Sequence, residues 1–390
     1  MANDVPLRPS LDAAALLQLF QRELAARLAE LRRPTVLVMG YTGAGKTSLI
    51  QAICGREVVP DDRIGAGLPR TTAFDLYEGE LIRFFDSKGF EPGQPEERFL
   101  EEVRRFLAEL RRGPRVDDHV QLVWYTIQGP GARVTSVDRS LLGMLRPCGL
   151  RPSAGRAVLL PREVGFGKPD DGPRPSVIVA LTKSDITRPD QLEAMVKVLV
   201  DDGIPRDRIV ACAESDPESL RRLVELSHRL LPAAYQDAFV AAQRVHIAKK
   251  EERARLLVHA AAAAAAAAGA LPIPVADSAL ITPLQLGLIA SLALLFNEPR
   301  EGLKTALMPV MAEALGVQLA GNLTKLIPGL GSVINASVAF ALTEAVGTVA
   351  IRYLSARCTA RLEGRPLPEF RLDPKEITGQ LRRLPWPGKR

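Results

Sequence analysis

The chain has 390 residues, of which 47% are hydrophobic and 25% charged, and this composition excludes a disordered or fibrous protein. A net charge of +6 is too diffuse to define a nucleic-acid-binding or membrane-surface protein. Cys54, Cys148, Cys212 and Cys358 contain no CxxC pair, which disfavours a disulfide framework or a zinc ribbon. The cysteine pattern therefore predicts a reducing, cytoplasmic compartment.

Residues 1–33 are predicted to form an N-terminal amphipathic helix, because Leu17, Phe20, Leu24 and Leu28 recur at helical spacing and no signal peptide is visible. From residue 34 to 232, short β-branched runs alternate with amphipathic helical patterns, which predicts a doubly wound α/β domain with a mainly parallel sheet. The expected strands are 35–39, 74–77, 82–85, 120–127, 176–181 and 208–212, and the expected helices are 96–112, 137–145, 191–200 and 218–231. Residues 147–175, rich in Pro, Gly and Arg, are predicted to be an inserted loop.

A phosphate-binding loop is predicted at residues 40–47, where Gly-Tyr-Thr-Gly-Ala-Gly-Lys-Thr fits GxxxxGK[ST] between a strand and a helix. Backbone N–H groups at a helix N-terminus can surround phosphate oxygens, while Lys46 neutralises the β- and γ-phosphates and Thr47 offers a hydroxyl to Mg²⁺. The predicted phosphate-binding residues in this segment are Gly40, Thr42, Gly43, Ala44, Gly45, Lys46, Thr47 and Ser48.

A second motif, DxxG, is formed by Asp86-Ser87-Lys88-Gly89 at the end of an apolar strand. A carboxylate there can hold Mg²⁺ through water, and the Gly89 N–H can reach a γ-phosphate. Thr71 and Thr72 lie where a switch loop supplies a further hydroxyl. The predicted metal ligands are Thr47, Thr72 and Asp86, with Gly89 added to the phosphate-binding residues.

A third motif, [NT]KxD, is formed by Thr182-Lys183-Ser184-Asp185 after another apolar strand. Asp185 would accept hydrogen bonds from the N1–H and exocyclic amine of guanine, and Lys183 would lie along the base. Cys212 and Ala213, after the last strand, occupy the place of a Ser-Ala-Lys guanine loop. The predicted guanine-binding residues are Thr182, Lys183, Asp185, Cys212 and Ala213.

These three motifs resemble the Era-like branch of translation-factor-type P-loop GTPases over residues 34–232. The resemblance implies binding of GTP or GDP with Mg²⁺ and hydrolysis of GTP. Phe90 follows Gly89 where Ras-type enzymes have a glutamine that orients water, and no other catalytic side chain is evident in the motifs. We therefore expect slow turnover without a partner. Gly43 replaces the asparagine usual in potassium-activated relatives, which argues against potassium activation.

The C-terminal third is predicted to be all-α. Residues 233–255 are expected to form a linking helix, residues 256–362 an apolar helical domain and residues 363–390 a basic tail. Only eight charged residues lie between positions 256 and 350. Segments at 271–277, 282–285 and 325–329 resemble the YcjF-like domain of unknown function, whose family is generally described as membrane-associated.

Two environments suit this apolar domain: a membrane contact, peripheral or integral at the cytoplasmic face of the inner membrane, or a soluble helical bundle. The run 278–296 is the better spanning candidate, and Lys249, Lys250, Arg253 and Arg255 form a basic collar before the apolar stretch. The sequence as a whole favours a slow GTP-hydrolysing switch protein. The alternatives are a GTP-dependent scaffold or membrane tether with negligible hydrolysis, and a ribosome- or RNA-associated GTPase supported by the basic tail.

Overall fold

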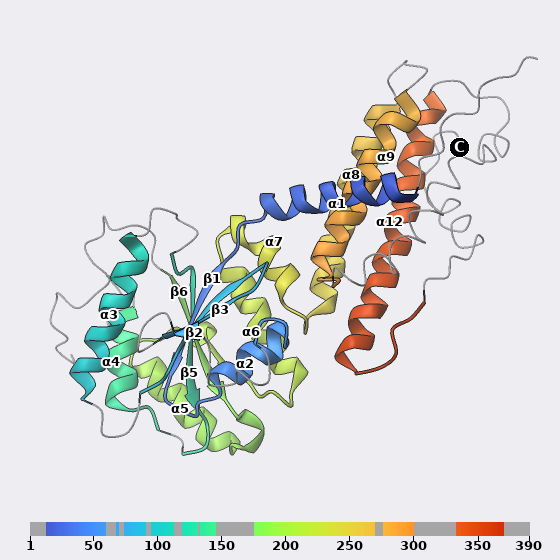
Figure 1. Cartoon of the computed structure of the whole chain (residues 1–390). Helices are drawn as coiled ribbons and strands as arrows, with labels where there is room; N and C mark the ends of the chain where they lie inside the picture. The colour runs from blue at the N-terminus through green and yellow to red at the C-terminus, as the bar shows by residue number, and fades with distance from the viewer. Residues whose placement is uncertain are drawn as a thin grey trace, which may run out of the picture. The chain divides into compact units, whose positions relative to one another are not determined.

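A computed structural model describes residues 13–59, 68–69, 74–90, 95–112, 119–131, 133–145, 175–269, 276–299 and 333–369 (Figure 1). The chain divides into two compact units. One unit is Leu31–His246, and the other combines Met1–Glu30 with Ile247–Arg390. The N-terminal helix therefore belongs to the same unit as the C-terminal helices.

A mainly parallel sheet forms the centre of the Leu31–His246 unit. Within the described residues it has seven strands in the order β2-β3-β4-β1-β5-β6-β7. These are β1 (Thr35–Gly40), β2 (Leu68–Pro69), β3 (Phe74–Glu78), β4 (Arg83–Ser87), β5 (Leu122–Gln128), β6 (Ser176–Thr182) and β7 (Ile209–Ala211). The pairs from β4 to β7 are parallel, whereas β2-β3 and β3-β4 are antiparallel. The two-residue strand β2 was not predicted from the sequence, and its Pro69 suits an edge position.

Helices cover both faces of this sheet, which confirms the predicted doubly wound α/β fold. They are α2 (Lys46–Cys54), α3 (Glu96–Arg112), α4 (Ser136–Leu145), α5 (Pro189–Asp201) and α6 (Pro217–Leu230), followed by α7 (Ala233–Ala242). Figure 1 shows α3 and α4 on one side of the sheet and α2 and α6 on the other. Leu37 and Met39 pack with α3, α4 and α5, while Trp124 donates to Ser227 of α6 at 3.0 Å. Because both faces are buried, the central strands are almost continuously apolar.

The segment 233–255, predicted as a single linking helix, instead belongs to two helices that are interrupted at Gln243. The buried Gln243 side chain donates to the carbonyls of Val240 and His246 at 3.3 and 3.1 Å and accepts from the His246 N–H at 2.8 Å. These bonds replace the helical ones at the break. The division between the two units falls after His246, within the segment 233–255 that was predicted to link residues 34–232 to the apolar domain.

Helices are the regular secondary structure of the second unit within its described residues, as predicted. It comprises α1 (Ala13–Glu30), α8 (Ile247–Gly269), α9 (Ala276–Leu295) and α12 (Val333–Leu362), with α8 packed on α12 and α9, and α1 packed on α9. A Cβ on Gly347 would lie 2.5 Å from Val258, so the small residue allows close approach of α12 to α8. Among the described residues, no helix combines the length and apolar character needed to cross a membrane.

Side chains from two other helices cap the C-terminal end of α9. Lys250 of α8 donates to the Leu295 carbonyl at 2.8 Å, while Cys358 and Arg361 of α12 donate to the carbonyls of Phe296 and Asn297 at 3.1 and 2.9 Å. Lys250 of the predicted basic collar is therefore not a surface cation, because the residue is only 1% exposed. Lys249 and Arg255 of the same collar pair with Glu252 and Glu251.

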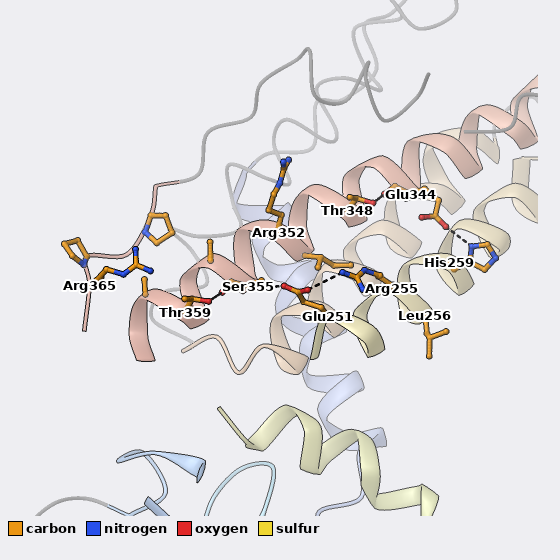
Figure 2. A pocket seen from close by; sticks show the side chains of 15 residues that line it. Glu251, Arg255, Leu256, His259, Glu344, Thr348, Arg352, Ser355, Thr359 and Arg365 are labelled. Carbon is orange, nitrogen blue, oxygen red and sulfur yellow. Dashed lines mark hydrogen bonds and ion pairs between the residues drawn. The ribbon is translucent and has the colours of Figure 1, made fainter. Parts of the chain in front are cut away.

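A groove of about 980 Å³ lies between α8 and α12 (Figure 2). On its walls Glu251 pairs with Arg255 at 3.2 Å and accepts from Ser355 at 2.5 Å, and His259 lies 2.9 Å from Glu344. The contacts of Glu251 with Ser355 and of His259 with Glu344 join α8 to α12 across the groove.

Several sequence predictions fall outside the described residues. They concern Thr71 and Thr72, most of the inserted loop 147–175, the segment 325–329, and the tail from residue 370 onward.

Candidate functional site

The phosphate loop joins the end of β1 to the start of α2, as the motif predicts. Gly43 and Gly45 adopt φ values of 78° and 79°, in the left-handed region that favours glycine. Gly40 also requires glycine, because a Cβ there would lie 2.2 Å from the Thr126 carbonyl oxygen. Ala44 is buried and Ser48 lies half-buried in the first turn of α2. The backbone N–H groups at this helix start form an anion-binding geometry.

Lys46 is held over the loop that it follows. Its Nζ donates to the carbonyl of Tyr41 at 2.9 Å and to that of Gly40 at 3.3 Å, and the residue is 6% exposed. Burial lowers the pKa of Lys46, and the nearby Asp86 carboxylate opposes that shift. A buried cation beside a helix N-terminus is a strong site for phosphate.

Thr47 and Asp86 form the candidate magnesium site. The Thr47 hydroxyl donates to Asp86 Oδ2 at 2.5 Å. The other carboxylate oxygen, Oδ1, is buried and has no hydrogen-bond partner among the described residues. Burial raises the pKa of Asp86 to about 6, since the charged form is poorly solvated there. A buried oxygen without a partner beside a hydroxyl suits a hard divalent cation, so these two residues would hold Mg²⁺.

The DxxG segment lies directly against the phosphate loop. The Thr42 N–H donates to the Phe90 carbonyl at 3.3 Å, and the Thr42 hydroxyl donates to the Lys88 carbonyl at 3.2 Å. Between them Gly89 has φ +89°, and a Cβ there would lie 2.8 Å from Lys46 Nζ. The glycine that is expected to read a γ-phosphate is therefore beside the phosphate-binding lysine.

The predicted base-reading motif also contacts the phosphate loop. Thr182 donates through its hydroxyl to the Ala44 carbonyl at 2.8 Å. Lys183 adopts the left-handed region at φ 56°, and its Nζ donates to the Gly43 carbonyl at 2.9 Å. Its aliphatic chain therefore extends from the end of β6 to the phosphate loop. Asp185 accepts a hydrogen bond from the Ser215 hydroxyl at 2.6 Å, which fixes its carboxylate.

The loop after β7 contains Cys212 and Ala213, the last two residues predicted to bind guanine. Cys212 is fully buried, and burial raises its pKa to about 12. Its carbonyl accepts from the Ser184 N–H at 3.2 Å, and its N–H donates to the Leu181 carbonyl at 2.8 Å. The Ala213 N–H donates to Ser219 at 3.1 Å. The hydroxyl that reaches Asp185 comes instead from Ser215, which the sequence prediction missed. The feature of the sequence that could have indicated Ser215 is its hydroxyl group in the same loop, three positions after Cys212.

All the described residues predicted for the site come together at one edge of the sheet. They lie at or just beyond the carboxyl ends of β1, β4, β6 and β7, which meet at this edge because those strands are parallel. The groups predicted to bind phosphate lie at the start of α2, those predicted to bind the metal ion at the end of β4 and the start of α2, and those predicted to recognise the base after β6. Such an arrangement can bind a guanine nucleotide with its metal ion.

The fold and the site define a P-loop GTPase domain. Residues 35–153, less than a third of the chain, match the family of 50S ribosome-binding GTPases. The match covers the phosphate loop and the DxxG segment, whereas Thr182 and Asp185 lie beyond it. A comparison with curated proteins finds no match.

Proposed function

We propose that this protein is a GTP-dependent switch that hydrolyses GTP slowly and transmits its nucleotide state to a partner through its helical unit. The proposal rests on one observation above others: Gly89 is held between Thr42 and Lys46, where its N–H can respond to a γ-phosphate. The Era-like and YcjF-like assignments are part of this proposal and rest on the sequence motifs alone.

Slow hydrolysis is proposed because Phe90 cannot position a water molecule. Phe90 is 8% exposed, and its ring packs against Tyr41 and Phe99 with centroids 5.3 and 5.5 Å away. An apolar side chain held in this way neither donates to water nor accepts from it. The chain's own contribution to the reaction is electrostatic: Lys46 and the start of α2 stabilise negative charge on the phosphate oxygens. When bound at Thr47 and Asp86, Mg²⁺ would neutralise further phosphate charge.

Single-turnover hydrolysis of GTP by the full chain with Mg²⁺ tests this proposal. We expect a rate of about 10⁻⁴ to 10⁻³ per second, the order seen for Ras-type chemistry without a partner arginine. Lys46→Ala should abolish nucleotide binding and provides the background. Turnover at about 1 per second or faster by the purified chain would contradict the slow switch. Undetectable hydrolysis with intact GTP binding would support the scaffold alternative instead.

A second candidate is a GTPase that acts on the ribosome, favoured by the description of the matching family as 50S ribosome-binding. In this case the partner is ribosomal RNA or protein. Salt-dependent co-sedimentation with 50S subunits, strongest with a non-hydrolysable GTP analogue, would support it. Binding to vesicles of anionic lipid, with no ribosome association, would instead favour the membrane-contact alternative.

A further inference from the structure

Tyr41 occupies a position that the phosphate-loop pattern leaves unspecified, yet it contacts both nucleotide-sensing segments. Its carbonyl accepts from Lys46 Nζ at 2.9 Å. Its backbone forms a parallel bridge with Phe90, and the two rings pack edge-on with centroids 5.3 Å apart. Tyr41 therefore joins the phosphate-binding lysine to the residue that follows Gly89.

The Tyr41 hydroxyl is tied to the start of α4. It lies 2.9 Å from Thr135 Oγ1, and Thr135 is the residue before the first turn of that helix. Thr135 and Asp138 form a capping box: Asp138 Oδ2 accepts from the Thr135 N–H at 2.8 Å, and Thr135 Oγ1 accepts from the Asp138 N–H at 3.2 Å. The Thr135 hydroxyl donates to Asp138 at 2.8 Å, so its single hydrogen is used and Tyr41 must be the donor in their bond.

The capping box is itself fixed to the sheet. Asp138 is 1% exposed, and its second carboxylate oxygen accepts from the Tyr125 hydroxyl of β5 at 2.7 Å. Burial raises the pKa of both Tyr41 and Tyr125, so each hydroxyl stays protonated and able to donate. The Tyr41 hydroxyl is therefore bonded to a rigid group.

We propose that Tyr41 is a positioning residue that holds the segment containing Gly89 and Phe90 against the phosphate loop by anchoring it to the capped start of α4. The inference rests on the proposed GTP-dependent switch. Phe99 of α3 also packs against the Phe90 ring, with the ring centroids 5.5 Å apart. Release of the Tyr41 hydroxyl would free its ring to move, and Phe90 and Gly89 would lose their fixed place beside Lys46. Recognition of a γ-phosphate depends on the position of Gly89 beside Lys46, whereas recognition of GDP does not.

The test measures the affinities of the full chain for GDP and for a non-hydrolysable GTP analogue, and takes their ratio. Tyr41→Phe removes the hydroxyl and keeps the ring, and Thr135→Val removes the acceptor. Each should lower the preference for the GTP analogue over GDP by about two- to tenfold, the worth of one hydrogen bond. Thr135→Val also removes the two bonds that its hydroxyl makes with Asp138, so it can lose more than Tyr41→Phe. The double variant should lose no more than Thr135→Val alone, because in that background the Tyr41 hydroxyl has no acceptor left to lose.

A matched control is Ser176→Ala, which also deletes a hydroxyl but at the opposite end of β6, where it donates to the Leu230 carbonyl at 3.3 Å. Its ratio should equal that of the wild type. An unchanged ratio in Tyr41→Phe, an equal loss of GDP and GTP affinity, or additive effects in the double variant would each overturn the role of Tyr41. A wild-type chain that binds neither nucleotide would overturn the proposed function itself.

Discussion

Replacing Gly89 with alanine probes the closest approach in the site. Gly89 adopts φ +89°, and an added Cβ would meet the Thr42 backbone nitrogen at 2.5 Å and Lys46 Nζ at 2.8 Å. A non-glycine residue in this region costs roughly 1 to 3 kcal/mol. The contact with a backbone atom adds to this cost, because the Thr42 nitrogen belongs to the phosphate loop and cannot rotate away.

The observed consequence should be a loss of GTP affinity. If the docked conformation of Gly89 is needed for the γ-phosphate, a strain of roughly 1 to 3 kcal/mol weakens GTP binding by about 5- to 150-fold, since 1.4 kcal/mol is tenfold in affinity. GDP lacks the γ-phosphate and should lose less. Isothermal titration of the full chain with GDP and with a non-hydrolysable GTP analogue measures both values.

Gly131→Ala is the control that separates the effect of backbone strain from the effect of the steric clash between the added Cβ and the phosphate loop. Gly131 has φ +100° in the same unit, but nothing lies within 4 Å of an added Cβ. This variant should lower the thermal stability of the domain and leave the ratio of GTP to GDP affinity unchanged. If Gly89→Ala binds the GTP analogue within twofold of the wild type, Gly89 does not lie against the phosphate loop in the binding-competent protein and the reasoning is refuted.

Four further predictions follow from the site and the unit boundary. Lys46→Ala should abolish GTP binding while the circular dichroism spectrum stays unchanged, and retained affinity would contradict the phosphate-loop assignment. Asp185→Asn should shift preference from GTP to xanthosine triphosphate in competition binding, because the amide can donate to the xanthine O2; a variant that still prefers GTP would contradict it. Residues 31–246 alone should be soluble and bind GTP with near-wild-type affinity, and aggregation of this fragment would show that the units fold together. Burial raises the pKa of Cys212 to about 12, above its ordinary value of 9.0. Between these two pH values the folded state binds more protons than the unfolded state, so the free energy of unfolding falls as the pH rises. Cys212→Ala should reduce that fall by up to about 1.4 kcal/mol per pH unit, measured by urea unfolding at pH 8 to 10.5, and an unchanged slope would show that the thiol is not the titrating group.

The strands, helices and nucleotide motifs could be predicted because their signals are local. An apolar run followed by a glycine-rich turn specifies β1, the phosphate loop and the start of α2 without knowledge of the rest of the chain. The same is true of α3 and α6, whose amphipathic patterns matched the helices of the structure closely.

Contacts between distant segments could not be predicted. The Ser215 hydroxyl bonds Asp185 from a different loop, and Tyr41 meets Thr135 although 94 positions separate them. The basic residues before the apolar stretch were predicted to form a basic collar, but Lys250 is buried at the C-terminal end of α9. It is placed there because the last carbonyls of a helix need hydrogen-bond donors. Which surface covers a side chain is a property of the tertiary structure, and periodicity does not encode it.

The hydrogen bonds from Thr182 and Lys183 to the carbonyls of Ala44 and Gly43 tie the base-reading motif to the phosphate loop. We therefore expect the two halves of the candidate nucleotide site to be thermodynamically linked, because ordering one half would lower the entropic cost of ordering the other. Guanosine and pyrophosphate should each bind more tightly when the other is present. A lineage that altered base specificity by substituting Thr182 or Lys183 would also weaken its binding of phosphate. Base specificity and phosphate affinity must therefore evolve together.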